Sequence, residues 1–245
     1  MQSSNKPQVP ESSTFARLEH EVAVAVQGLW NGSSGHTVRC VPTRRTVVVE
    51  VGGRFLFGKW RVGARRDAAA EWHWLHVLPL LGLRTPMPVV WLGKGRRTLV
   101  VTKGVAGRSL DAWMLDATRE GWVSELVDYL VAHVAPLVRR LHDHGLAYRD
   151  LYWNHLFVAD PRRGDPPVFL DVERVVRPRW RWARWVVKDL AGLWSSIPDG
   201  VEVPPRAALR FLRAYYGGSL YPHRATLAAI VAKAARIRAH QPRFG

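Results

Sequence analysis

HGLAYRDLYWNH, residues 144–155, decides the fold, because it places an Arg-Asp pair in a loop directly after a long helix. The helix is predicted over residues 123–142, where apolar side chains recur at spacings of three and four along one face. Gly145 can adopt the left-handed conformation that ends such a helix, and Pro136 inside the pattern predicts a kink or a break. We therefore expect Asp150 to follow a helix cap.

The part of the chain before this helix indicates a small antiparallel sheet. Gly52-Gly53 separates two segments rich in β-branched and aromatic residues, and a glycine pair tolerates the positive φ of a tight hairpin turn. The strands expected here cover residues 46–51, 54–60, 89–92 and 98–102. Helices are expected over residues 15–29 and 66–81. This half therefore combines a sheet with one internal helix.

The part after residue 104 is mainly helical. A short hairpin is expected from residues 156–158 and 168–171, and further helices over residues 185–194, 205–216 and 223–240. The pattern predicts an α+β protein with a small antiparallel-sheet lobe followed by a helical lobe. We place the boundaries at residues 1–35 for an N-terminal tail and short helix, 36–103 for the first lobe and 104–245 for the second.

Composition limits the classes of protein and partner. The formal charge is +16 and arginine contributes most of it, which favours anionic partners, although codon usage that favours arginine would give the same excess. A single cysteine, Cys40, excludes an internal disulfide framework. The N-terminus has no signal-peptide pattern, no apolar run is long enough to span a bilayer, and no nucleic-acid-binding motif occurs. We therefore expect a cytoplasmic protein that does not bind nucleic acid.

Four charged residues occur in the order that phosphoryl transfer needs. Lys59 ends a strand, Glu71 lies near the start of the following helix, Asp150 follows the long helix, and Asp171 ends a short strand. The reaction needs a cation on the nucleotide phosphates, a carboxylate for the metal, and a carboxylate that orients the attacking hydroxyl. Each residue alone is weak evidence, but their order and spacing together indicate a kinase.

The same residues carry a family resemblance. LHDHGLAYRD, residues 141–150, resembles the helix end and catalytic loop of the protein-kinase-like superfamily, with Tyr148 in the usual place of histidine. YRDLYWNHLFV, residues 148–158, more narrowly resembles the bacterial lipopolysaccharide core kinases of the Kdo/WaaP family. Glu71-Trp72, LRTPMP at residues 83–88 and KDLAGL at residues 188–193 match the same family. The resemblance covers residues 36 to 195.

The resemblance implies a two-lobed protein-kinase-like fold that uses ATP and Mg²⁺. Asp150 would orient the acceptor hydroxyl and accept its proton. Lys59 would hold the α- and β-phosphates and pair with Glu71. Asp171 would be the magnesium ligand. Two further residues would have structural roles, namely Asp189, which would brace the catalytic loop, and Arg149 beside Asp150.

The sequence departs from the protein-kinase pattern at two places. Protein kinases have an asparagine as second metal ligand five residues after the catalytic aspartate, where this chain has His155 preceded by Asn154. Either residue could reach the metal. A glycine-rich phosphate loop is also missing, because VPTRRT occupies residues 41–46. Arg44 and Arg45 could replace its backbone contacts to the phosphates.

The spacing of Asp171 and Asp189 limits the acceptor. They are eighteen positions apart, which leaves almost no room for the segment on which protein kinases dock peptides. The short span favours a small or glycolipid hydroxyl as acceptor. Together with it, the family resemblance implies phosphorylation of a sugar hydroxyl, heptose or Kdo, on the lipid-linked inner core of lipopolysaccharide at the cytoplasmic face of the inner membrane. The alternatives are a kinase of another small molecule or of protein, and an inactive nucleotide-binding module.

Tryptophan and arginine alternate in VRPRWRWARW, residues 176–185. One interpretation is that the tryptophans pack in the second lobe and the arginines are solvated. The other is a patch that binds an anionic membrane surface, because tryptophan favours the headgroup level and arginine attracts anionic lipid. The second interpretation predicts peripheral membrane attachment.

Overall fold

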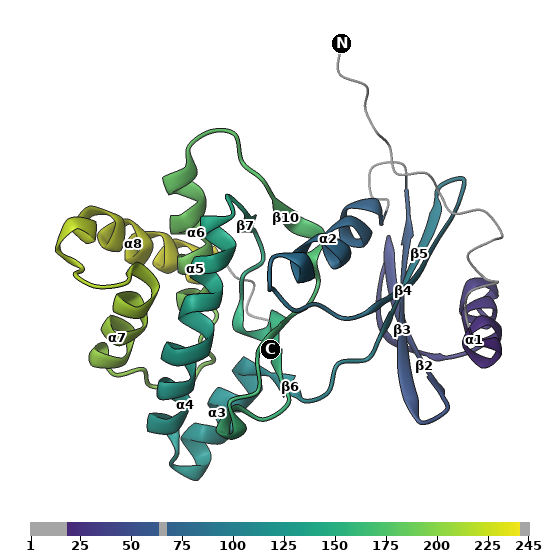
Figure 1. Ribbon diagram of the computed structural model, residues 1–245, viewed down its shortest axis with the longest axis horizontal. Helices are drawn as coiled ribbons and strands as arrows, with labels where there is room; N and C mark the ends of the chain where they lie inside the picture. Colours follow the sequence, from purple (N-terminus) through teal and green to yellow (C-terminus); the bar gives the residue numbers. More distant parts are fainter. Residues whose placement is uncertain (1–18, 64–67, 241–245) are drawn as a thin grey trace. The chain divides into compact units, whose positions relative to one another are not determined.

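The computed structural model describes residues 19–63 and 68–240. The chain divides into two compact units, whose ribbons are drawn in Figure 1. The first unit contains the chain up to Val77 together with Pro86–Val105. The second contains Leu78–Thr85 together with the chain from Ala106 onward.

The first unit is built on a five-stranded antiparallel sheet in the order β1-β2-β3-β5-β4. Its strands are β1 (His36–Val41), β2 (Arg44–Val51), β3 (Arg54–Val62), β4 (Pro88–Lys94) and β5 (Arg97–Lys103). The predicted hairpin is confirmed, because β2 pairs with β3 and the turn glycines Gly52 and Gly53 have φ angles of 55° and 73°. The sequence pattern does not predict β1, because all six of its residues are exposed and show no alternation.

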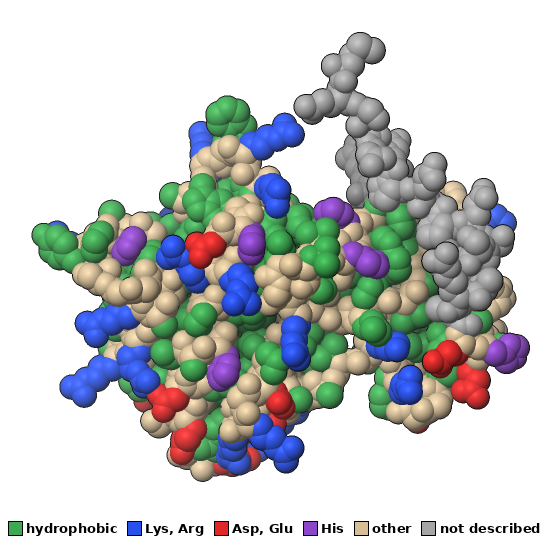
Figure 2. Space-filling model, in the orientation of Figure 1, with side chains coloured by type: hydrophobic (Ala, Val, Ile, Leu, Met, Phe, Trp, Pro, Cys, Tyr) green, Lys and Arg blue, Asp and Glu red, His purple; other side chains and the backbone are tan. Residues whose placement is uncertain are grey.

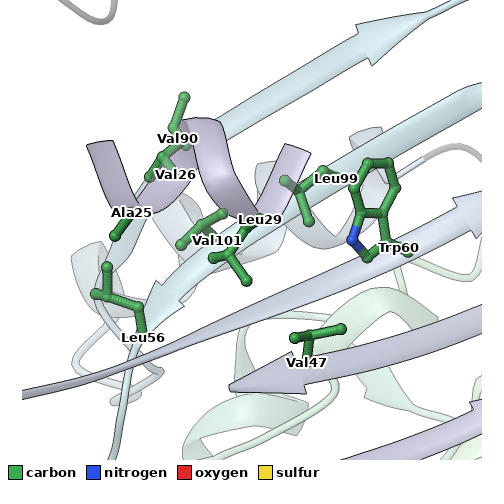
Figure 3. Close-up of a cluster of buried hydrophobic side chains, with 9 residues drawn as sticks. All are labelled: Ala25, Val26, Leu29, Val47, Leu56, Trp60, Val90, Leu99 and Val101. Atoms are coloured by element: carbon green, nitrogen blue, oxygen red, sulfur yellow. The ribbon is translucent and has the colours of Figure 1, made fainter. Parts of the chain in front are cut away.

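Helix α1 (His20–Asn31) covers one face of this sheet. Its side chains Ala25, Val26 and Leu29 form a buried cluster with side chains from four strands (Figure 3). The strand members are Val47, Leu56, Trp60, Val90, Leu99 and Val101. Full burial of each valine or leucine contributes roughly 1.5–3 kcal/mol, so the cluster fixes α1 on the sheet. The first residues of the helix predicted over residues 15–29 lie outside the described part of the chain.

Helix α2 (Ala69–Leu80) is bound to the sheet through Glu71, which is 2% exposed. The Glu71 carboxylate accepts hydrogen bonds from Lys59 Nζ at 2.6 Å and from Arg61 Nη2 at 2.8 Å. Lys59 and Arg61 are two residues apart on β3, so their side chains share one face, whereas Trp60 between them packs in the α1 cluster. Helices α1 and α2 therefore lie on opposite faces of the sheet (Figure 1). Residues 66 and 67 of the helix predicted over residues 66–81 lie outside the described part.

The second unit is mainly helical, as predicted. Its helices are α3 (Leu110–Glu120), α4 (Val123–Tyr129), α5 (Ala135–Asp143), α6 (Trp182–Ser195), α7 (Pro205–Tyr216) and α8 (Arg224–His240). Helix α6 packs along α8, and α5 packs along α7. Helix α3 is an addition to the predicted elements, and Gly107 precedes it with a φ angle of 92° at a point where a Cβ atom would collide with the Val158 carbonyl.

The long helix predicted over residues 123–142 is broken, as Pro136 suggested. A π-helical segment, Leu130–Val134, separates α4 from α5, and the Ala135 amide donates to the Leu130 carbonyl across five residues. Pro136 comes two residues after this segment, and because Val134 and Ala135 keep right-handed helical dihedrals, its missing N–H falls within a continuous helical backbone and interrupts the regular bonding there. The interruption therefore precedes the proline rather than following it.

Short strands surround the loop that follows α5. Strand β6 (Arg108–Ser109) pairs with β8 (Leu156–Val158), which pairs with β9 (Val168–Phe169), so the predicted hairpin is confirmed. Strand β7 (Ala147–Tyr148) pairs with β10 (Val175–Val176). Pairing on both sides fixes the two ends of residues 149–155.

Helix α6 approaches this loop closely at Gly192. A Cβ atom built at Gly192 would lie 2.6 Å from the Leu151 carbonyl oxygen and 3.3 Å from the Tyr152 ring. Since Cβ atoms do not approach a backbone oxygen so closely, only glycine permits this packing distance without a shift of the loop.

Replacement of Glu71 by alanine should destabilise the protein by about 3–5 kcal/mol, because it leaves the buried Arg61 guanidinium without its carboxylate. The measurement is the free energy of unfolding from urea denaturation. The exposed carboxylate of Glu50 on β2 provides the control, since Glu50→Ala should change stability by no more than about 0.5 kcal/mol. Equal effects of the two substitutions would contradict the assignment.

Gly192→Ala should destabilise the protein by about 1–3 kcal/mol, because the added methyl group pushes against the Leu151 backbone. Gly93→Ala is the matched control, since a Cβ atom there meets Thr98 Cγ2 at 3.8 Å, an ordinary contact distance. Thermal unfolding of both variants separates the steric effect from the general effect of adding a methyl group. A Gly192→Ala protein as stable as Gly93→Ala would refute the close approach.

Candidate active site

In the first unit, Lys59, Arg61 and Glu71 form one ion-pair cluster. Lys59 remains 21% exposed, whereas Arg61 and Glu71 are almost fully buried. The three side chains together have a formal charge of +1, which suits an anionic ligand at the exposed member. The sequence predicts Lys59 and Glu71 but not Arg61. The sequence feature that could have identified Arg61 is its spacing of two residues from Lys59 on a strand, which places both cations on one face.

The strand register separates Arg44 from Arg45. Arg44 pairs with Arg61 and Thr46 pairs with Lys59, so Arg44 shares the face of β2 and β3 that bears the Lys59 side chain. Arg45 pairs with Trp60 on the opposite face, and its Nε atom donates to Thr37 Oγ1 at 2.7 Å across β1. A role of either arginine in phosphate binding stays a prediction, and the register favours Arg44.

In the second unit, the chain enters the loop through a Schellman cap of α5. Gly145 has a φ angle of 68°, its amide donates to the His142 carbonyl, and the Leu146 amide donates to the Leu141 carbonyl. The predicted left-handed glycine cap is therefore confirmed. It turns the chain into β7, so that Asp150 follows two residues after a paired strand.

Asp189 of α6 lies beneath this loop and is 1% exposed. Its Oδ2 atom accepts a hydrogen bond from the Tyr148 amide at 2.6 Å and lies 3.3 Å from His142 Nε2. His142 Nδ1 in turn lies 2.6 Å from the Tyr215 hydroxyl. Burial raises the pKa of Asp189, and the hydrogen bond with His142 opposes that rise. The network joins α5, α6 and α7 to the start of the loop.

Asp150 is partly buried and held from two sides. Its Oδ1 atom accepts from Arg174 Nη1 at 2.8 Å, and its main-chain carbonyl lies 2.8 Å from His155 Nδ1. Burial raises the pKa of the neighbouring Tyr152 hydroxyl, and the charge of Asp150 raises it further, so this phenol stays protonated at neutral pH. The sequence does not single out Arg174. The only feature that could have drawn attention to it is its position three residues after Asp171.

Arg149 helps to hold the loop in place through its backbone groups. Its side chain is exposed, its amide donates to the Arg174 carbonyl at 3.4 Å, and its carbonyl accepts from Lys188 Nζ. Burial lowers the pKa of Lys188, which the charges of Asp189 and Asp150 partly offset. Lys188 of α6 therefore fixes the residue immediately before Asp150.

The two candidates for the second metal position differ in their surroundings. The Asn154 side chain is exposed, whereas the His155 ring stacks against Tyr148 with centroids 6.4 Å apart. Because a carbonyl oxygen lies 2.8 Å from His155 Nδ1, that nitrogen bears the proton and Nε2 remains an acceptor in the neutral ring. Neither residue is excluded by its position.

Asp171 begins the short 3₁₀ helix Val172–Arg174 in a left-handed conformation, with φ 53° and ψ 44°. The backbone before it is fixed, because the Leu170 amide donates to the His155 carbonyl at 2.8 Å. The Tyr148 hydroxyl also donates to the Leu170 carbonyl. The tyrosine that replaces the usual histidine therefore joins the loop of Asp150 to the segment of Asp171.

Comparisons with known proteins identify related sequences. The model of the lipopolysaccharide kinase (Kdo/WaaP) family matches residues 58–215. The lipopolysaccharide core heptose(I) kinase WaaP of Escherichia coli strain K12 is 27% identical over 77% of this chain and 84% of its own length. A second Escherichia coli heptose(I) kinase WaaP is also 27% identical, over 86% of this chain and 93% of its own length.

Two solved structures share the fold. A structure of WaaP in complex with acyl carrier protein has a TM-score of 0.70 and 28% identity, covering 86% of this chain and 96% of that one. An aminoglycoside-3'-phosphotransferase of type VIII has a TM-score of 0.60 at 20% identity, covering 86% and 97%. The predicted protein-kinase-like α+β fold is confirmed. Since the family model also spans more than half of the sequence, the chain belongs to the lipopolysaccharide kinase (Kdo/WaaP) family.

Proposed function

We propose that this protein transfers the γ-phosphate of ATP to a sugar hydroxyl, heptose or Kdo, of the lipopolysaccharide inner core. The observation that supports this most is the loop around Asp150, which lies within the residues that the family model matches and is fixed by contacts from α6 and from Arg174. The Escherichia coli relatives named as heptose(I) kinases favour heptose over Kdo.

Asp150 is the group we assign to the acceptor hydroxyl. Its Oδ1 atom is engaged by Arg174, so Oδ2 is the atom that would accept the hydroxyl proton. The Arg174 guanidinium fixes the orientation of this carboxylate. Arg174 is thus a positioning residue for the proposed base.

Lys59 would hold the α- and β-phosphates of ATP, oriented by its 2.6 Å contact with Glu71. Arg44 shares the same face of the sheet and is the better of the two arginines to contact phosphate oxygens. Charge-assisted contacts from a guanidinium could replace the backbone amides of a glycine-rich loop.

The donor set fits magnesium. Mg²⁺ prefers oxygen ligands, which Asp171 and the Asn154 amide supply, whereas His155 offers a nitrogen already oriented by the Asp150 carbonyl. When bound, Mg²⁺ neutralises charge on the transferring phosphates. We therefore assign Asp171 and Asn154 to the metal, and His155 to positioning of the loop.

The protein would act as a peripheral enzyme at the cytoplasmic face of the inner membrane. No helix in the described ranges 19–63 and 68–240 is long and apolar enough to cross a bilayer. Trp180 is 83% exposed among arginines in residues 176–185, which supports contact with an anionic lipid surface. The relative solved with acyl carrier protein makes such a protein a candidate partner as well.

Asp150→Asn should lower transfer of labelled γ-phosphate from ATP to purified core glycolipid by at least about 100-fold, because general-base catalysis contributes at least that much. The dissociation constant for ATP should change less than about twofold. Asp199→Asn, at an exposed carboxylate outside the loop, is the control and should retain full activity. Wild-type protein that binds ATP without any transfer would instead indicate an inactive nucleotide-binding module.

Asn154→Ala should raise the Mg²⁺ concentration needed for half-maximal rate by about tenfold, and Asn154→Asp should restore it, because the carboxylate returns an oxygen ligand. His155→Ala should lower kcat with the Mg²⁺ requirement unchanged, since it removes the contact with the Asp150 carbonyl. The measurement is the initial rate as a function of Mg²⁺ at saturating ATP. The reverse pattern would assign His155 to the metal.

A further inference from the structure

A cavity of about 330 Å³ lies between α6 and α8 in the second unit. Its lining consists of Arg184, Val187 and Lys188 from α6, and Ala229, Lys233 and Arg236 from α8. Four of these six residues are cationic. The two helices pack along each other, so both sides of the cavity belong to a rigid part of the unit.

The cavity has a strongly positive character without an acidic lining residue. None of the four cations forms an ion pair with a carboxylate of the described residues. Lys and Arg side chains project from many places on the visible face of this unit (Figure 2), and several of them, such as Arg108 and Arg119, lie beside a carboxylate. Like charges close together repel, and an anion would relieve that repulsion.

The cavity adjoins the loop of the proposed base. Lys188 lines it and also donates to the Arg149 carbonyl, one residue before Asp150. Burial lowers the pKa of Lys188, and the charge of a bound anion would oppose that decrease. An occupant of the cavity would therefore lie on the same part of the second unit as the group we assign to the acceptor.

The lining favours phosphate over other anions. Two guanidinium groups offer forks of N–H donors that match phosphate oxygens, and two ammonium groups supply compact charge for a dianion. The other two lining residues, Val187 and Ala229, have apolar side chains that cannot accept hydrogen bonds in competition with a phosphate.

We propose that the α6–α8 cavity binds a phosphate group. We favour a phosphate group that the acceptor glycolipid already carries, and this choice of ligand rests on the proposed function. The other source with the same chemistry is the headgroup phosphate of a membrane lipid. In both cases the site would fix the acceptor side of the reaction rather than ATP.

The test compares two variants that each remove two cations. Lys233→Ala/Arg236→Ala changes the α8 side of the cavity and leaves Lys188 and the catalytic loop intact. Arg206→Ala/Arg213→Ala removes two exposed arginines of α7 and is the charge-matched control. Isothermal titration with inorganic phosphate, in the presence of a saturating non-hydrolysable ATP analogue, should show at least about tenfold weaker binding to the cavity variant, as loss of charge-assisted bonds predicts. The control should bind like wild type.

Kinetic and vesicle measurements distinguish the two sources. If the acceptor supplies the phosphate, the cavity variant should raise KM for the glycolipid at least about tenfold, with kcat and the KM for ATP unchanged, and dephosphorylated acceptor should abolish the difference. If lipid supplies it, the same variant should instead lose binding to vesicles containing phosphatidic acid. Phosphate binding that is equal in the two double variants would overturn the proposal. A third result would separate the site from the proposed function. If the wild-type protein transfers no phosphate to glycolipid, but the cavity variant binds inorganic phosphate more weakly than wild type, the proposed function is refuted and the phosphate site is retained.

Discussion

The buried Asp189 carboxylate is the interaction on which the second unit depends. A charge removed from water is costly, and it is tolerated here because the Tyr148 amide and His142 both contact Oδ2. Three helices and the start of the Asp150 loop thereby share one electrostatic centre. The start of the loop is therefore held by a group that is almost inaccessible to solvent and belongs to the helical core.

The first unit also contains a buried carboxylate that joins separate elements. There one carboxylate, Glu71, lies between two cations, and the cation that remains partly exposed is Lys59. In the first unit the buried Glu71 contacts Lys59 directly, whereas in the second the buried Asp189 holds the backbone at the start of the loop that contains Asp150. Such pairs contribute less to net stability than to a single, well-defined arrangement of the site.

Much of this architecture follows from local patterns. The Gly52-Gly53 turn and the helix cap at Gly145 are local in sequence, whereas Lys59, Glu71, Asp150 and Asp171 are identified by their order along the chain and by the family resemblance. Arg61 and Arg174 are not evident, because their importance arises from partners ten and twenty-four residues away. The fully exposed β1 has no periodicity to detect, and the register that separates Arg44 from Arg45 depends on strand pairing.

The left-handed backbone at Asp171 has a consequence for how this residue can change over evolutionary time. A residue with a Cβ atom is less stable in that conformation than glycine, and aspartate is among the few that tolerate it. Glycine at this position would relax the backbone while removing the carboxylate. Asp171→Gly is therefore a substitution in which backbone stability and the carboxylate that we assign to the metal oppose each other.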